Sequence, residues 1–181
     1  GALNGLAAHR REALWESERA IRPAGPLFAP GVKSEEEPQR APLAPMTAPE
    51  RIRSDFYGTG VTIGAHPMKL YRDRMRGVCT AADLHRARPN QIVKVAGFVI
   101  CRQRPGTANG FIFLSIEDET GIANAIVEPK KFDEFRETLV RAPYVIVQGI
   151  LQNQQGAISI KLRHVEPLEL NVAAVPSHDF S

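Results

Sequence analysis

Five short runs rich in β-branched residues, separated by clusters of turn residues, occupy the stretch from Gln91 to Leu168. The runs cover residues 92–100, 111–116, 122–127, 144–151 and 157–165. Between the third and fourth runs the pattern changes, because Phe132, Phe135 and Leu139 recur at steps of three or four, which predicts a helix over 130–139. Short strands with turn residues between them are typical of an all-β barrel or sandwich.

Five strands with one helix between the third and the fourth is the order of an oligonucleotide/oligosaccharide-binding (OB) barrel. Gly97 at the centre of the first run agrees with this order, because the long first strand of such a barrel needs a bulge or bend to close. The sequence therefore predicts a mainly β chain. Its centre is a five-stranded OB-fold nucleic-acid-binding domain at 91–168, preceded by short helices and a Pro-rich linker.

The residues outside the predicted barrel divide by composition. Apolar residues at seven-residue spacing predict a helix over 3–21. Seven of the fourteen prolines fall within 22–49, which predicts an extended, partly disordered linker over 22–46. Residues 47–90 read as a basic connector of small helices, and 169–181 as a tail without a clear pattern.

Three cap signals mark the helices of this connector. Thr47-Ala48-Pro49-Glu50 has the form of a capping box, in which the threonine and glutamate side chains each bond the other's backbone amide. Gly64-Ala65-His66-Pro67 opens a second short helix through Arg74, and Thr80-Ala81-Ala82-Asp83 opens a third. Elements this short have no core of their own, so we expect them to pack on the barrel.

The distribution of charge and the number of cysteines limit the partners and the cellular compartment that the sequence suits. Residues 51–90 carry 8 Lys/Arg against 3 Asp/Glu, a net +5, while the whole chain is only +3. This local charge either attracts phosphate or is a solvated surface. Two cysteines make no disulfide framework and indicate a reducing compartment. No run is long and apolar enough to predict a membrane span, and the start at Gly1 without a methionine suggests a piece of a longer protein.

No catalytic constellation is visible in the sequence. There is no glycine-rich phosphate loop, and the five histidines are scattered rather than set at metal-ligand spacing. Glu117-Asp118-Glu119 is the only acidic cluster inside the predicted barrel. Its oxygens suit Mg²⁺, but acidic residues before a glycine are also common in β-turns, and we favour the turn.

The outer face of the predicted barrel carries the candidate site. Alternation along the second run sends Ile112, Leu114 and Ile116 inward and leaves Phe111 and Phe113 outward. Outward aromatic rings stack nucleic-acid bases, and Asn124 on the third run offers an amide to a base edge. Cations surround them on the first and fifth runs: Lys94, Arg102, Arg104, Lys161 and Arg163. The alternative is that the two phenylalanines cover an edge of the core.

Several motifs of this stretch, in this order, resemble the OB domain of bacterial C-family replicative DNA polymerases. They are Val95-Ala96-Gly97-Phe98-Val99, Arg102-Gln103-Arg104-Pro105, Gly110-Phe111-Ile112-Phe113-Leu114, Glu117-Asp118-Glu119-Thr120-Gly121 and Ala125-Ile126-Val127. The lead-in resembles the error-prone, ImuC-type branch of that family. There Arg10-Arg11-Glu12-Ala13-Leu14-Trp15 looks like the end of a helix-hairpin-helix region, and Asp55-Phe56-Tyr57-Gly58-Thr59-Gly60 and Gly64-Ala65-His66-Pro67-Met68 look like the connector.

The resemblance implies a DNA-directed DNA polymerase of damage-induced, mutagenic synthesis in the bacterial cytoplasm. Its catalytic carboxylates and Mg²⁺ would lie in an upstream palm domain, so no active site, metal or other cofactor is expected in these residues. The barrel is expected to bind single-stranded DNA, and the helix-hairpin-helix remnant at 1–21 to contact duplex.

A second, local resemblance is to the anticodon-binding barrel of aspartyl- and lysyl-type tRNA synthetases. In that barrel an aromatic residue at the position of Phe113 stacks a base, and an amide at the position of Asn124 reads one. Two functions therefore remain open: a single-strand-binding module, or a domain that docks accessory mutagenesis proteins. No membrane partner is expected.

Overall fold

The computed structural model describes residues 7, 9–21, 42–59, 64–154, 156–170 and 178–180. The chain divides into two compact units, Gly1–Arg51 and Ile52–Ser181. Most of the predicted linker at 22–46 and of the predicted tail lies outside the described residues. Within the described residues, no helix combines the length and the apolar character that a membrane crossing requires.

In the first unit, helix α1 (Arg10–Ile21) begins directly after His9. The Nδ1 atom of His9 accepts a hydrogen bond from the backbone amide of Glu12 at 3.2 Å, which satisfies one of the open amides of the first turn. The predicted helix over 3–21 therefore started too early, since residues 7 and 9 are not helical, while 3–6 lie outside the described residues.

Helix α2 (Ala48–Thr59) begins with the predicted capping box. The amide of Thr47 donates to Glu50 Oε2 at 2.8 Å, and the amide of Glu50 donates to Thr47 Oγ1 at 3.4 Å. Arg11 on α1 forms an ion pair with the same glutamate at 3.1 Å. These contacts confirm the cap and tie α1 to the start of α2 inside the first unit.

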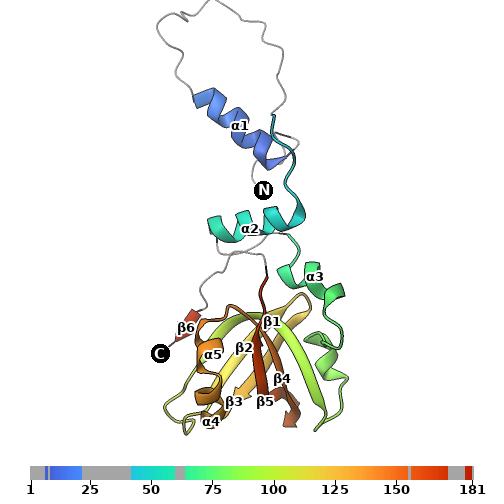
Figure 1. Ribbon diagram of the computed structural model, residues 1–181, viewed down its shortest axis with the longest axis vertical. Coiled ribbons are helices and arrows are strands. Elements are labelled where there is room, and N and C mark those ends of the chain that lie inside the picture. The colour runs from blue at the N-terminus through green and yellow to red at the C-terminus, as the bar shows by residue number, and fades with distance from the viewer. Residues whose placement is uncertain are drawn as a thin grey trace, which may run out of the picture. The chain divides into compact units, whose positions relative to one another are not determined.

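The second unit is built on a closed barrel of five strands (Figure 1). The strands are β1 (Ile92–Gln103), β2 (Ile112–Asp118), β3 (Gly121–Val127), β4 (Tyr144–Gln154) and β5 (Ala157–Pro167). Their order is β2-β3-β5-β4-β1, and β1 also pairs with β2, which closes the ring. β3 and β5 run parallel and the other pairs antiparallel, which confirms the predicted OB fold. A sixth strand, β6 (His178–Phe180), pairs in parallel with the end of β1.

β1 can pair with both β2 and β4 because it bends strongly in the middle. A methyl group added to Gly97 would collide with the carbonyl oxygen of Glu117 and come within 2.8 Å of Ile116 Cγ2 on β2. The register between β1 and β2 then shifts between Val99 and Cys101. The bulge and the close strand crossing are the features that the mid-strand glycine predicts.

The helical turn between β3 and β4 is two short helices rather than one. α4 (Pro129–Glu134) and α5 (Arg136–Arg141) are separated by Phe135, whose φ of −112° and ψ of 21° leave the helical region. Phe135 instead packs against the core and sets its ring edge-on to His164 of β5 at 5.2 Å. Burial of this aromatic ring therefore outweighs the continuous helix that the spacing predicted over 130–139.

The connector packs on the outside of the barrel through three short elements, α3 (Pro67–Tyr71) and the 3₁₀ turns η1 (Arg72–Arg74) and η2 (Ala82–His85). Met68 of α3 is fully buried in a cluster with Ala96 of β1 and Tyr144 of β4. The expected packing on the barrel is thus confirmed for α3, and for η2 through the buried Leu84.

The predicted cap at Thr80 is also present. Its Oγ1 accepts from the amide of Asp83 at 3.3 Å, and its own amide donates to Asp83 Oδ2 at 3.2 Å. This reciprocal pair spans the start of η2 and satisfies two backbone amides locally.

Candidate nucleic-acid interface

The outer face of β2 carries the predicted aromatic. Ile112, Leu114 and Ile116 are buried in the barrel core, and the alternate residue Phe113 remains 38% exposed. The predicted alternation along this strand is confirmed, because the inward set fills the barrel and leaves no room there for the ring. Phe113 therefore does not serve as a core side chain.

Strand register aligns three different side chains with Phe113. Phe113 pairs with Gln103 of β1 on one side and with Ile126 of β3 on the other, and Ile126 pairs with Lys161 of β5. Neighbouring strands lie about 4.8 Å apart, and β5 is the second strand from β2. The backbone of Lys161 therefore lies roughly 10 Å from the backbone of Phe113. We call these residues the aromatic row.

A second, polar row lies beside the aromatic row. Ser115 of β2 pairs with Cys101 of β1 and with Asn124 of β3. The hydroxyl of Ser115 donates to Asn124 Oδ1 at 3.1 Å, which orients the exposed amide group. The amide nitrogen of Asn124 is a donor that this hydrogen bond does not use.

The cations near these rows differ in their partners. Lys161 forms an ion pair with Glu128 at 2.7 Å, with 41% and 38% of the two side chains exposed. An exposed pair of this kind contributes at most about 1 kcal/mol, so a phosphate can compete for the lysine. Arg163 follows on β5 beside a register shift and is exposed, and its side chain makes no hydrogen bond or ion pair with any described residue.

Arg102 does not lie on the predicted face. The bulge in β1 reverses the alternation, so Arg102 pairs with the inward-facing Leu114. Its guanidinium donates to the carbonyl oxygens of Leu139 at 2.6 Å and Ala142 at 2.7 Å. The expected place of Arg102 beside the aromatics is wrong, because this side chain caps the open carbonyls at the end of α5.

The other predicted residues lie apart from the two rows or at their border. Lys94 sits near the opposite end of β1 and forms an ion pair with Glu166 at 3.0 Å. Arg104 lies over the ring of Phe132, 5.7 Å from its centre, and Phe111 is half-buried just before β2. The structure thus brings together Phe113, Asn124 and Lys161, with Arg163 further along β5.

Four members of the rows were not among the predicted site residues: Cys101, Gln103, Ser115 and Ile126. Ser115 and Ile126 could have been predicted from the sequence. Each lies two residues after a predicted site residue on the same strand, Phe113 and Asn124, and therefore on the same face. Cys101 and Gln103 could not be predicted in this way, since their side of the strand depends on the bulge between Val99 and Cys101.

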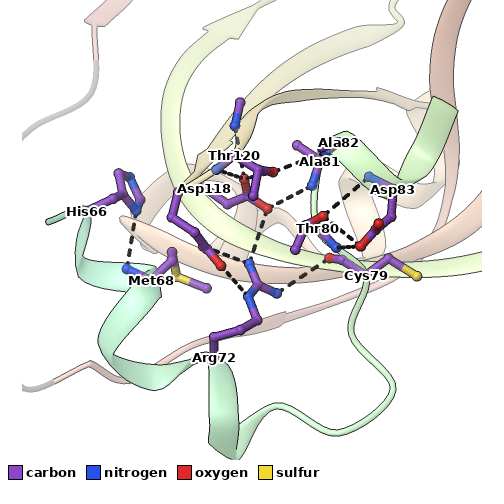
Figure 2. A network of polar contacts seen from close by, with 12 residues as sticks. His66, Met68, Arg72, Cys79, Thr80, Ala81, Ala82, Asp83, Asp118 and Thr120 are labelled. Atoms are coloured by element: carbon purple, nitrogen blue, oxygen red, sulfur yellow. Dashed lines mark hydrogen bonds and ion pairs between the residues drawn. The ribbon is translucent and has the colours of Figure 1, made fainter.

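The acidic turn after β2 is structural. Asp118 Oδ1 accepts hydrogen bonds from the amide and hydroxyl of Thr120 at 2.7 and 2.6 Å, and from the amide of Gly121 at 3.1 Å. Its Oδ2 accepts from the amide of Ala81 at 2.8 Å and from Arg72 at 3.1 Å. Figure 2 shows this carboxylate between the connector and the β2–β3 turn. The carboxylate is therefore fully occupied by protein donors, as the turn interpretation predicts.

The neighbouring carboxylate completes this network. Glu119 accepts two bonds from Arg72, and these bonds hold the pKa of the glutamate below its ordinary value. Among the described residues, no group of three His, Cys, Asp or Glu side chains could hold a metal ion.

Comparison with known proteins agrees with this geometry. Residues 93–168 match the family described as an OB-fold nucleic acid binding domain. The barrel is therefore an OB-fold domain of the nucleic-acid-binding class. A solved structure, asparaginyl-tRNA synthetase from Pyrococcus horikoshii, matches with a TM-score of 0.45 and 24% identity over 54% of this chain and 24% of that chain, a likeness too distant to inform on function.

The chain as a whole is a relative of one region of the error-prone DNA polymerases. It is 39% identical over 172 residues to the error-prone DNA polymerase of Anaeromyxobacter sp. (strain K), which covers 94% of this chain and 15% of that protein. It is 38% identical over 187 residues to the error-prone DNA polymerase of Methylococcus capsulatus, covering 99% of this chain and 17% of that protein. The resemblance to the error-prone branch is confirmed, and the chain spans less than a fifth of the length of these relatives.

Proposed function

We propose that the aromatic row and the polar row bind single-stranded DNA. In this role the chain would serve an error-prone DNA polymerase in damage-induced, mutagenic synthesis in the bacterial cytoplasm. The observation that carries the proposal is the exposed ring of Phe113 on a strand whose inward residues fill the core. With 38% of Phe113 exposed, part of its ring is available to stack on a base.

The chemistry of the two rows suits an unpaired strand. A base stacks on Phe113, with Ile126 extending the apolar surface, and the phosphate beside it is held by Lys161. Asn124 donates from its amide nitrogen to a base edge. A single polar donor beside a stacking surface favours binding that tolerates many sequences, as a replicated template requires.

Nucleotidyl transfer would belong to another part of such a polymerase. The relatives are named DNA polymerases, and the resemblance assigns the catalytic carboxylates and their Mg²⁺ to a palm domain. The role proposed for the barrel is to hold the strand rather than to react with it.

The test is fluorescence anisotropy of a labelled oligothymidine with the chain at low and moderate salt. We expect saturable binding that weakens as salt rises. Phe113→Ala should weaken it by about 1–3 kcal/mol, roughly 5- to 150-fold. Val140→Ala is the matched control, because Val140 is 52% exposed on α5 and belongs to neither row, and it should bind as the parent does.

The result that would overturn the proposal is the absence of binding at low salt by a chain whose circular dichroism shows it folded. Equal effects of Phe113→Ala and Val140→Ala would contradict it as well. Either result would favour the alternative function, in which this face docks accessory mutagenesis proteins.

A further inference from the structure

A hollow of about 410 Å³ lies on another side of the barrel, next to η1. Its apolar lining comes from Met75 and Val78 of the connector, Ile146 of β4, and Leu168 and Leu170 after β5. The same apolar residues pack around Met68 and Tyr144, so the floor of the hollow is part of a stable cluster. A preformed apolar floor of this kind can accept a flat, weakly polar group.

Cations lie around this floor. Arg74, Arg76 and Lys94 line the hollow, against one carboxylate, Glu169. Arg74 and Arg76 are exposed, and their side chains make no hydrogen bond or ion pair with any described residue. Lys94 is paired with Glu166 at the border. Two cations without partners next to an apolar floor favour a ligand that is both flat and negatively charged.

The segment that carries these arginines is held in place. Arg72, two residues before Arg74, bonds Asp118 and Glu119 of the β2–β3 turn at 2.6–3.1 Å. Because η1 is tied to the barrel in this way, the arginines need less ordering when they bind an anion, which lowers the entropic cost of binding.

The aromatic row leads toward the hollow. Lys161 pairs with Ile150 of β4, and Ile150 pairs with Ile92 of β1, which is 53% exposed. The next residue of β1 on the same face is Lys94, at the rim of the hollow. The outside of the barrel therefore carries an interrupted line of apolar and cationic side chains from Phe113 to Arg74 and Arg76.

We propose that this hollow is a second contact for the same single strand, taking one base on its apolar floor and the adjoining phosphate on Arg74 and Arg76. The proposal rests on the function proposed above, because it assigns the strand's path beyond Lys161. It also gives the excess positive charge of residues 51–90 a phosphate-binding role.

The test compares two lengths of labelled oligothymidine in anisotropy titrations of the full chain. One is about 5 nucleotides, enough for the rows alone, and the other about 16, within the range that one OB fold can cover. Arg74→Gln/Arg76→Gln is the variant. Arg136→Gln/Arg141→Gln on α5 is the control, because it removes the same charge from exposed residues that line neither site.

We expect the Arg74/Arg76 variant to bind the long strand at least roughly fivefold more weakly and the short strand within roughly twofold of the parent. Loss of this one phosphate contact should reduce the salt slope for the long strand by about 0.7. The control variant should match the parent for both lengths, apart from a small uniform effect of net charge.

The failures of the two proposals are distinguishable. Suppose that Phe113→Ala weakens binding of both oligonucleotides, while the Arg74/Arg76 variant weakens binding of neither, or by no more than the control does. The hollow is then not a contact of the strand, and the two rows remain its binding face. If Phe113→Ala has no effect, the binding face is wrong. If thymidine monophosphate alone saturates the backbone amide signals of residues 74–78, the hollow is a free-nucleotide site and not a strand contact.

Discussion

The guanidinium of Arg72 forms a two-pronged ion pair with the carboxylate of Glu119, with Nε 2.6 Å from Oε1 and the second nitrogen 2.9 Å from Oε2. The same guanidinium reaches Asp118 at 3.1 Å. Charge-assisted, bidentate bonds of this kind are the strong ones in proteins. They connect η1 to the β2–β3 turn, so we expect η1 and the barrel to unfold together.

Asp118→Asn should destabilise the barrel strongly. The aspartate accepts five hydrogen bonds, and an asparagine NH₂ would face donors instead of accepting from them. We expect the free energy of unfolding to fall by about 2–4 kcal/mol in urea titrations. Asp133→Asn, on the exposed side of α4, is the control and should stay within about 0.5 kcal/mol of the parent. A loss for Asp118→Asn as small as the control's would contradict this account of the turn.

Arg102→Gln should reduce stability without reducing DNA affinity. The guanidinium bonds the carbonyls of Leu139 and Ala142 and does not lie on the outer face. Two charge-assisted bonds are lost, so we expect a cost of about 2–3 kcal/mol in unfolding. Anisotropy at a temperature where the variant is folded should return the parent's dissociation constant. If the folded variant bound single-stranded DNA more weakly than the parent, Arg102 would be a DNA-binding residue after all.

Glu128→Gln should strengthen binding of single-stranded DNA. Glu128 holds Lys161 at 2.7 Å and places a negative charge where a phosphate is expected. An exposed pair contributes up to about 1 kcal/mol, so its removal should raise affinity by up to about fivefold at low salt, and less as salt screens the charges. Glu137→Gln, at an exposed ion pair on α5, tests for a general effect of net charge. Equal gains in the two variants would mean that Lys161 has no particular role.

Acid should destabilise the fold partly through His66. Its Nδ1 accepts the amide of Met68 at 3.2 Å at the start of α3, and burial, opposed in part by nearby carboxylates, lowers its pKa below the ordinary 6.5. The unfolded chain therefore takes up the proton first, and this contribution, complete above pH 6.5, is lost as pH falls from there through the lowered pKa. The lowered pKa of Glu119 adds a separate loss below its ordinary value of 4.5.

The measurement is the free energy of unfolding in urea between pH 7.5 and 5.5. His66→Asn keeps a cap acceptor but cannot titrate, so its stability should fall less over this range than the parent's. His85→Asn, exposed on η2, should keep the parent's slope. If the free energy of unfolding of His66→Asn fell with pH as steeply as the parent's, His66 would not contribute to the acid destabilisation.

Gly97→Ala should cost about 3 kcal/mol or more. The added methyl would meet the carbonyl oxygen of Glu117 and Ile116 Cγ2, which belong to the backbone and core of β2 and cannot yield without opening the barrel. Gly106→Ala is the control, because nothing lies within 4 Å of its added methyl and its backbone does not require glycine. We expect the control to stay within about 1 kcal/mol of the parent in urea titrations.

Much of the fold could be predicted because it depends on neighbours in sequence. The five strands, the alternation around Phe113 and the caps at Thr47 and Thr80 arise from side-chain spacing over a few residues. Even so, the single helix predicted over 130–139 breaks at Phe135, because burial of that ring against the core outweighs local helical spacing.

Residues of the candidate site could be predicted only where the alternation within a single strand fixes the side on which the side chain lies. Phe113 and Asn124 were found from alternation within β2 and β3. Lys94 and Arg102 were grouped with them by charge and by their place on β1, and both lie elsewhere. The bulge after Val99 reverses the strand's alternation, and no local pattern marks the residue at which the register shifts.

The amino-acid sequence by itself determined the five strands, their arrangement along the chain as in an OB barrel, and the outward position of the aromatic ring, because hydrophobic alternation and turn chemistry act over short stretches of chain. Only the tertiary structure decided which cations stand beside that ring, that Arg72 and Asp118 join across 46 positions, and that Arg74, Arg76 and Lys94 surround one hollow. These relationships depend on strand register and barrel closure, which set distances between residues far apart in the chain.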